Sequence, residues 1–161
     1  MQTEKLSPRA YYLVSREIAT GNESNLTDTT TATPKGSSAA ASAAINDGLQ
    51  VHLSGSKIHW LDAFYENIAD LLQFPDYFTN NLDSFDEVIN DLSWLDEATI
   101  HIYITEYSAF LKEENSLKRL QVIELLGRAA ESGLFDLYVE KVSESLSDLQ
   151  KNGLHFTELK Q

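Results

Sequence analysis

The sequence predicts a small α/β domain over residues 49–161, preceded by a flexible extension over residues 1–48. From residue 49 onwards, short runs of β-branched and aromatic residues alternate with longer segments of helical periodicity. Residues 20–48 consist largely of Thr, Ser, Ala, Gly and Asn, and they have too few apolar side chains to build a core. We therefore expect that deletion of residues 1–46 leaves the melting temperature nearly unchanged. The chain contains no cysteine, which excludes disulfide bonds and cysteine-based metal sites.

The segments beyond residue 49 follow one another as strand, helix, helix, strand and helix. The runs at 49–53 and 98–105 are the two clearest strands. Apolar residues at helical spacing predict helices over 59–73, 80–92 and 116–132, with a short helix over 106–112 and Gly133 as the end of the longest. Connections of this length favour parallel strands joined by right-handed crossovers. In the extension, residues 11–14 are apolar, but this stretch is too short to assign.

The charge of the chain is −13 at pH 7. No lysine or arginine occurs between Lys57 and Lys112, whereas eleven aspartates and glutamates do. Such a field repels the phosphates of nucleic acid and attracts a basic protein, although an acidic surface also serves solubility alone. No run approaches the ~20 apolar residues that cross a membrane, and the first residues lack the apolar region of a signal peptide. We therefore expect a cytoplasmic protein with a basic protein partner.

The most informative stretch is residues 74–92, which predicts a turn that leads into a helix. Pro75 favours the turn, and Thr79, Asn80 and Asn81 offer side-chain oxygens that can cap the helix. Apolar residues then recur at helical spacing: Leu82, Phe85, Val88, Ile89 and Leu92. The opposite side carries Asp83, Asp86, Glu87 and Asn90. The stretch therefore predicts a short helix with one buried face and one anionic face, entered through the aromatic pair Tyr77 and Phe78.

This stretch resembles the signature of the barstar family of ribonuclease inhibitors. In that family an apolar-Pro-acidic-Tyr-aromatic turn leads into Asn-Leu-Asp-small-apolar, which opens the second helix. The matching parts are residues 74–78, Phe-Pro-Asp-Tyr-Phe, and residues 81–85, Asn-Leu-Asp-Ser-Phe. The resemblance covers residues 49–161 and has no counterpart to residues 1–48. It implies a three-stranded parallel β-sheet packed by helices, in a protein that is not an enzyme and uses no cofactor.

The third parallel strand of this fold has two candidates. Residues 134–139 follow Gly133 directly, but apolar residues recur here at the spacing of a helix face: Phe135, Tyr138, Val139, Val142, Leu146 and Leu149. Residues 154–159 alternate like a strand, and they follow an Asn-Gly pair that ends a helix well. We therefore predict a helix over 135–151 and the third strand at 154–159.

The resemblance also implies that the acidic helix enters the cationic active site of a ribonuclease. The candidate partner-binding residues are Tyr77, Asn81, Asp83, Asp86, Glu87 and Asn90. The family commonly has an aromatic residue where Asp86 stands and an aspartate where Glu87 stands. The family also places acidic residues on its last long helix against the partner. The matching positions here are Arg128 and Ser132, and because neither is acidic, no binding role is carried over to them. Trp94 either borders the interface or closes the core.

Three hypotheses on function follow. The first is an inhibitor or immunity protein that binds a basic ribonuclease or related toxin domain as a 1:1 heterodimer and is otherwise a monomer. The second is a module of the same fold that binds a basic partner other than a nuclease. The third is a histidine-metal enzyme, because His52, His101 and His155 stand in predicted strands and would share a sheet face if in register. No nucleophile elbow or glycine-rich phosphate loop supports a hydrolase or a nucleotide-binding protein.

Overall fold

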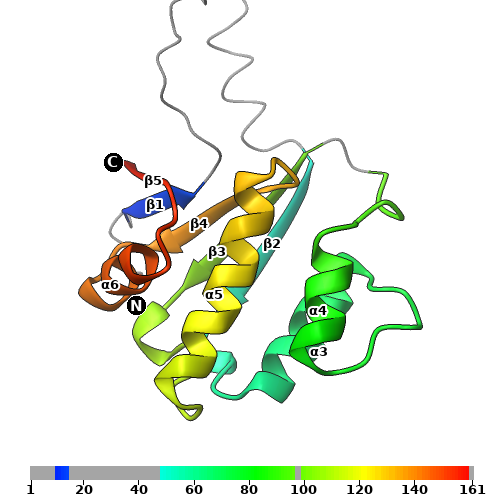
Figure 1. Ribbon diagram of the computed structural model, residues 1–161, viewed down its shortest axis with the longest axis horizontal. Helices are drawn as coiled ribbons and strands as arrows, with labels where there is room; N and C mark the ends of the chain where they lie inside the picture. Colours follow the sequence, from blue (N-terminus) through cyan, green and yellow to red (C-terminus); the bar gives the residue numbers. More distant parts are fainter. Residues whose placement is uncertain (1–9, 15–47, 97–98, 160–161) are drawn as a thin grey trace, which may run out of the picture.

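The computed structural model describes residues 10–14, 48–96 and 99–159 (Figure 1). The strands are β1 (Tyr11–Val14), β2 (Leu49–Ser54), β3 (Ile100–Thr105), β4 (Asp136–Glu140) and β5 (Phe156–Leu159). The helices are α3 (Leu61–Leu72), α4 (Leu82–Ile89), α5 (Ser116–Glu131) and α6 (Ser143–Lys151), with the 3-10 turns η2 (Gly55–Lys57) and η3 (Tyr107–Ala109). The predicted helices over 59–73, 80–92 and 116–132 are confirmed. Gly133 follows α5 with a φ of 93°, a left-handed conformation that suits glycine.

The strands form one mixed sheet in the order β2-β3-β4-β1-β5. β2, β3 and β4 are parallel, whereas β1 pairs antiparallel with both β4 and β5. Among the strands of the described residues, β1 alone therefore runs against the others. The α/β class is confirmed, but the predicted three-stranded parallel sheet is wrong, because the sheet is five-stranded and mixed.

The third parallel strand is β4, so the predicted helix over 135–151 and the choice of 154–159 were wrong. Leu137 and Val139 face the core with 0% exposure, whereas Tyr138 between them points to the other face. The helical spacing in the sequence arose because the apolar residues of β4 and those of the following helix, α6, happen to be separated by intervals that match one continuous helix. Residues 154–159 do contain β5, but β1 lies between β5 and β4.

β1 brings part of the N-terminal region into the folded domain. Tyr12 and Val14 are buried in the core, and the Tyr12 ring packs edge-on against Phe156 at 5.1 Å between centroids. The boundary expected at residue 49 therefore leaves out a strand of the sheet. Residues 1–9 and 15–47, the remainder of the expected flexible extension, lie outside the described residues.

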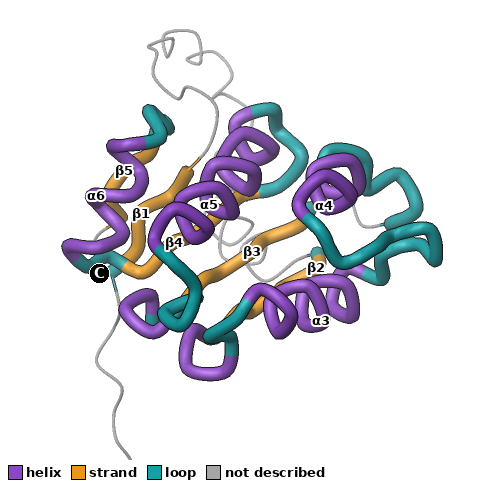
Figure 2. The backbone as a smooth tube through the Cα atoms, turned by 60° about the horizontal axis from the view of Figure 1, so that its bottom comes forward, coloured by secondary structure: helices purple, strands orange, loops and turns teal. Residues whose placement is uncertain are grey.

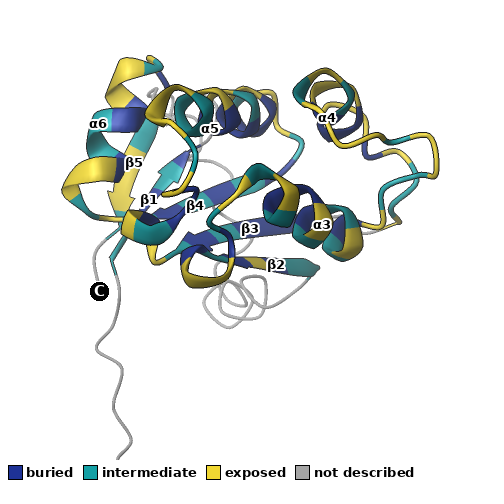
Figure 3. Cartoon of the chain, turned by 90° about the horizontal axis from the view of Figure 1, so that it is seen from below, coloured by how far each residue is buried: buried dark blue, intermediate teal, exposed yellow. Residues whose placement is uncertain are grey.

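Within the described ranges, α3, α4, α5 and α6 cover the same face of the sheet (Figures 2 and 3). The parallel strands β2, β3, β4 and β5 follow one another across the sheet in the same order as in the sequence. Because each connection between them is a right-handed crossover, every connecting helix lies on the same side of the sheet. The core lies between this helical layer and the sheet, where Leu53, Phe64, Phe85, Ile102 and Leu126 have no exposed surface. Because α4 packs against α5 at the outside of this layer, one of its faces is left to solvent (Figure 3).

Candidate functional site

α4 is only eight residues long, and local side-chain hydrogen bonds define where it begins. Oδ1 of Asn81 accepts a hydrogen bond from the backbone N–H of Ser84 at 2.8 Å, as a helix N-cap does. Nδ2 of Asn81 donates to Oγ1 of Thr79 at 2.8 Å, and the N–H of Thr79 donates to Oγ of Ser84 at 3.0 Å. The Asn81 side chain thus sets the direction of α4, a structural role in addition to the expected one.

The two faces of α4 are fully separated, as its periodicity predicts. Phe85, Val88 and Ile89 have no exposed surface, and the Phe85 ring packs edge-on against Phe64 at 5.2 Å between centroids. The opposite face carries the exposed side chains of Asp83, Asp86, Glu87 and Asn90. The buried face therefore holds the acidic side chains in place relative to the rest of the domain.

The turn before α4 divides its aromatic residues between core and solvent. Phe78 packs edge-on against Phe74 at 4.9 Å and against Tyr65 at 5.9 Å, whereas Tyr77 is 56% exposed. Trp94 donates from Nε1 to the carbonyl oxygen of Leu72 at 2.9 Å and is half-buried. Trp94 therefore closes the core, and Tyr77 is the large aromatic side chain that this turn presents to solvent.

The carboxylates of α4 have no ion-pair partner among the residues that the structure describes. Asp83, Asp86 and Glu87 form no ion pair within the described part of the chain. Asn90 donates from Nδ2 to the backbone oxygen of Asp86 at 2.8 Å and to its Oδ1 at 2.9 Å, which orients this carboxylate. The face is therefore a set of solvent-exposed negative charges, one of them oriented by Asn90, that attract cationic groups.

A residue of α5 joins this face, although sequence reasoning did not find it. A groove of about 190 Å³ between α4 and α5 is lined by Asp83, Asp86, Gln121 and Glu124, together with two leucines. Arg128, one turn further along, pairs with Glu124 at 4.0 Å, and it also donates to Glu131 at 3.3 Å and to the carbonyl oxygen of Asn152 at 2.9 Å. The periodicity of α5 predicts only that Glu124, next to the buried Ile123, is exposed. It does not reveal that α4 packs beside α5, and therefore it does not place Glu124 next to Asp83 and Asp86.

The three strand histidines do not come together. His52 stacks on Tyr103 at 4.7 Å between ring centroids, and Nδ1 of His101 lies 3.3 Å from the hydroxyl of Tyr138. His155 precedes β5, and its Nδ1 lies 2.9 Å from a carboxylate oxygen of Glu131 on α5. Within the described ranges, no group of three or more His, Cys, Asp or Glu residues is placed to hold a metal ion.

The fold and the site together define an α/β domain that presents a carboxylate-rich helix to solvent. The family model described as Barstar (barnase inhibitor) matches residues 49–152, and the chain therefore belongs to the barstar family. A search among curated proteins finds no match. In the described part of the chain, no helix combines the length and the apolar character that crossing a membrane requires.

Proposed function

We propose that the protein is an inhibitor that binds a basic ribonuclease, or a related toxin domain, through the exposed face of α4. The observation that carries this proposal is a set of three carboxylates on one helix face, Asp83, Asp86 and Glu87, in a member of the barstar family. None of the three forms an ion pair with another described residue. The cationic groups that a ribonuclease uses to bind phosphate are the natural partners of these carboxylates. The bound inhibitor would occupy the position of the substrate phosphates and so block the active site.

The local structure of α4 favours tight binding because little has to be ordered on association. The N-cap at Asn81 and the buried Phe85 hold the helix in place, and Asn90 already orients the carboxylate of Asp86. A pre-ordered binding face loses less conformational entropy when it meets its partner. Tyr77, exposed beside the helix, supplies an aromatic contact of the type that is enriched in interfaces.

A basic partner other than a nuclease is the second candidate, and Asp86 is the observation that favours it. An aspartate stands where the family commonly has an aromatic residue, and it adds a charge to the face in place of a flat apolar contact. Pull-down from the native lysate followed by mass spectrometry distinguishes the two candidates. Capture of a ribonuclease or toxin domain supports inhibition, and capture of other basic proteins alone supports the second candidate.

The substitution Glu87→Ala tests the site directly. We expect a change of no more than about 0.5 kcal/mol in the free energy of unfolding, because the side chain is exposed. We expect a loss of at least about 2 kcal/mol in binding free energy, because a desolvated cationic group of the partner would be left unpaired. Inhibition of barnase, or of the captured nuclease, over a concentration series of each variant provides the measurement.

The matched control for this substitution is Asp70→Ala. Asp70 is an exposed acid on α3 that lies outside the α4 face. Its replacement by alanine removes one negative charge, as Glu87→Ala does. We expect this variant to inhibit as the unmodified protein does, apart from a small effect on long-range attraction. Equal inhibition by Glu87→Ala and the unmodified protein would contradict the proposed site.

Association with the partner is also expected to slow steeply as salt concentration rises. The net charge of −13 attracts a basic partner over distances that salt screens, with a Debye length of about 10 Å at 0.1 M. Stopped-flow measurement of the association rate constant between low and high ionic strength tests this expectation. A rate constant independent of salt would argue against an anionic interface.

A further inference from the structure

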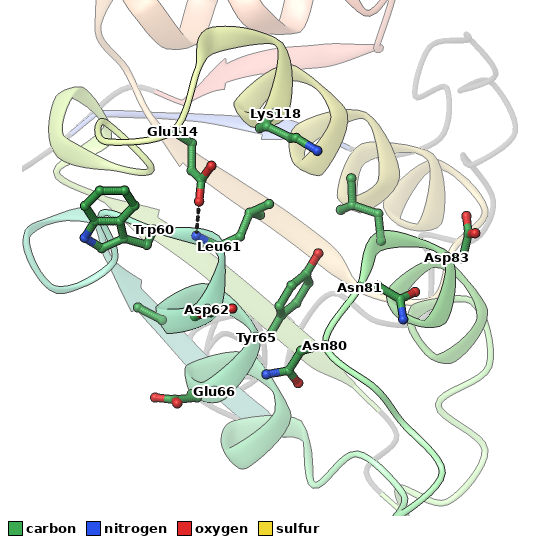
Figure 4. A pocket seen from close by; sticks show the side chains of 12 residues that line it. Trp60, Leu61, Asp62, Tyr65, Glu66, Asn80, Asn81, Asp83, Glu114 and Lys118 are labelled. Carbon is green, nitrogen blue, oxygen red and sulfur yellow. Dashed lines mark hydrogen bonds between the residues drawn. The ribbon is translucent and has the colours of Figure 1, made fainter.

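A second acidic cavity lies beside the α4 face and shares Asn81 and Asp83 with it. It occupies about 740 Å³ between the start of α3, the residues that lead into α4 and the start of α5 (Figure 4). Its walls include the aromatic side chains of Trp60 and Tyr65 and the carboxylates of Asp62, Glu66, Asp83 and Glu114. A cavity of this size is in the range of about 300 to 1,000 Å³ that is typical of sites for small groups.

Tyr65 is the side chain that marks this cavity as a binding site. The residue is 3% exposed, and its ring packs against Phe64 at 5.8 Å and Phe78 at 5.9 Å between centroids. Its hydroxyl makes no hydrogen bond to any described residue, and Figure 4 shows it pointing into the cavity. The Tyr65 side chain is almost fully buried, but its hydroxyl oxygen is reached from the cavity, where a ligand can hydrogen-bond to it.

The protonation state of Tyr65 adds to this description. Burial, followed by the nearby carboxylates of Asp62 and Glu114, raises the pKa of Tyr65 to about 12. The phenol therefore stays protonated at physiological pH. Its oxygen can accept a hydrogen bond from a ligand while its O–H donates to one of the surrounding carboxylates.

The charge of the cavity selects a cation. Four carboxylates line it, against the single ammonium group of Lys118. One of the four is fixed, because Oε2 of Glu114 accepts a hydrogen bond from the backbone N–H of Leu61 at 2.8 Å. At the rim, Trp60 is 54% exposed and offers a flat aromatic surface. Carboxylates around an aromatic face match a planar cation with several N–H donors, which is a guanidinium group.

We propose that this cavity receives the guanidinium group of an arginine side chain presented by the protein partner. The inference rests on the proposed function, because the arginine would belong to the basic protein that binds α4. Asn81 and Asp83 line the cavity and also belong to the candidate α4 face, so the two surfaces are continuous (Figure 4). A partner seated on α4 therefore reaches the cavity with a neighbouring side chain, which gives the complex a second anchor.

Binding of a small probe tests the cavity independently of any nuclease. Nα-acetyl-arginine methylamide is titrated into the full chain at low ionic strength, and the backbone amide shifts of Leu61 and Asn81 and the indole shift of Trp60 are followed by NMR. We expect a dissociation constant on the order of 1 mM. The neutral citrulline analogue, which has nearly the same shape, should bind at least about tenfold more weakly because it lacks the charge.

Variants then assign the binding to the named groups. Tyr65→Phe keeps the packed ring and removes only the hydroxyl, and it should weaken arginine binding about fivefold. Glu66→Gln should weaken it about twofold to threefold. Asp70→Asn, the same change of charge on α3 outside the cavity, should leave binding unchanged. Lys118→Met removes the competing ammonium and should strengthen binding.

Several results would overturn the inference. The first is equal affinity of the unmodified protein for the arginine and citrulline probes. The second is a Tyr65→Phe variant that binds the arginine probe as tightly as the unmodified protein and has the same melting temperature. The third is an equal effect of Glu66→Gln and Asp70→Asn on the affinity for the arginine probe. The last comparison remains valid even if Tyr65→Phe does not fold. In a complex with the captured partner, Glu66→Gln should also weaken affinity more than Asp70→Asn does, and no difference there would exclude a partner arginine. The effect of Glu87→Ala on inhibition tests the proposed function separately, so the two can fail independently.

Discussion

A chain that begins at Gly48 is expected to be less stable than the full chain by at least about 3 kcal/mol, because it lacks β1. This contradicts the expectation from composition that the N-terminal region adds nothing to stability. Tyr12 and Val14 are buried in the core, and burial of each such side chain contributes about 1.5 to 3 kcal/mol. β5 would also lose the strand with which it pairs. Since whole domains are stable by only about 5 to 15 kcal/mol, the shortened chain could be largely unfolded.

Denaturant titration of the two chains, followed by circular dichroism, measures this difference. Two single substitutions in β1 serve as matched controls for the role of its core face. Val14→Ala removes methyl groups with no exposed surface, whereas Leu13→Ala alters a half-buried neighbour on the opposite face of the sheet. Val14→Ala should therefore destabilise through the cavity that it leaves. Equal midpoints for the chain from Gly48 and the full chain would show that β1 is dispensable.

Replacing Phe85 with alanine is expected to destabilise the protein by about 3 to 5 kcal/mol through the cavity it opens. The Phe85 ring has no exposed surface and packs against Phe64, Tyr65 and Phe74, with centroid distances of 5.2 to 6.4 Å. These neighbours come from α3 and the turn before α4, so the loss would loosen the attachment of α4 to the core. Thermal and denaturant unfolding of the purified variant provide the measurement.

Glu87→Ala is the natural counterpart to Phe85→Ala, since the two residues are two positions apart on α4 and lie on opposite faces. One substitution should reduce stability with the binding groups intact, and the other should reduce binding with the core intact. A stable Phe85→Ala variant together with a destabilised Glu87→Ala variant would mean that the faces of α4 are reversed.

The sequence was most informative where one segment carries its own pattern. Phe85, Val88 and Ile89 recur at helical spacing, and this spacing alone predicts the buried face of α4. Where two short elements adjoin, periodicity misled: Val139 of β4 and Leu149 of α6 combined into the pattern of one helix. β1 was also too short to assign, because its place in the sheet depends on pairing with strands that are distant in sequence.

The candidate site was predictable only to the extent that it lies on one helix. Asp83, Asp86 and Glu87 follow from the pattern of α4 and the family signature, and the structure places all three on the exposed face. Glu124 and the unpartnered hydroxyl of Tyr65 depend on how α4, α5 and α3 pack together. Tyr65 in particular has the sequence context of an ordinary core aromatic residue.

The place of β1 between β4 and β5 has a consequence for how the chain folds. Tyr12 is paired with Val139 and Glu158, so both neighbours of β1 lie far downstream of it in the sequence. Contacts of such long sequence separation form slowly, because a large loop must close before they stabilise the structure. During synthesis the β2-β3 pair and the α4 helix emerge well before this closure. The edge of β4 stays open until β1 docks, so the last step of folding is the one most exposed to aggregation through unpaired strands.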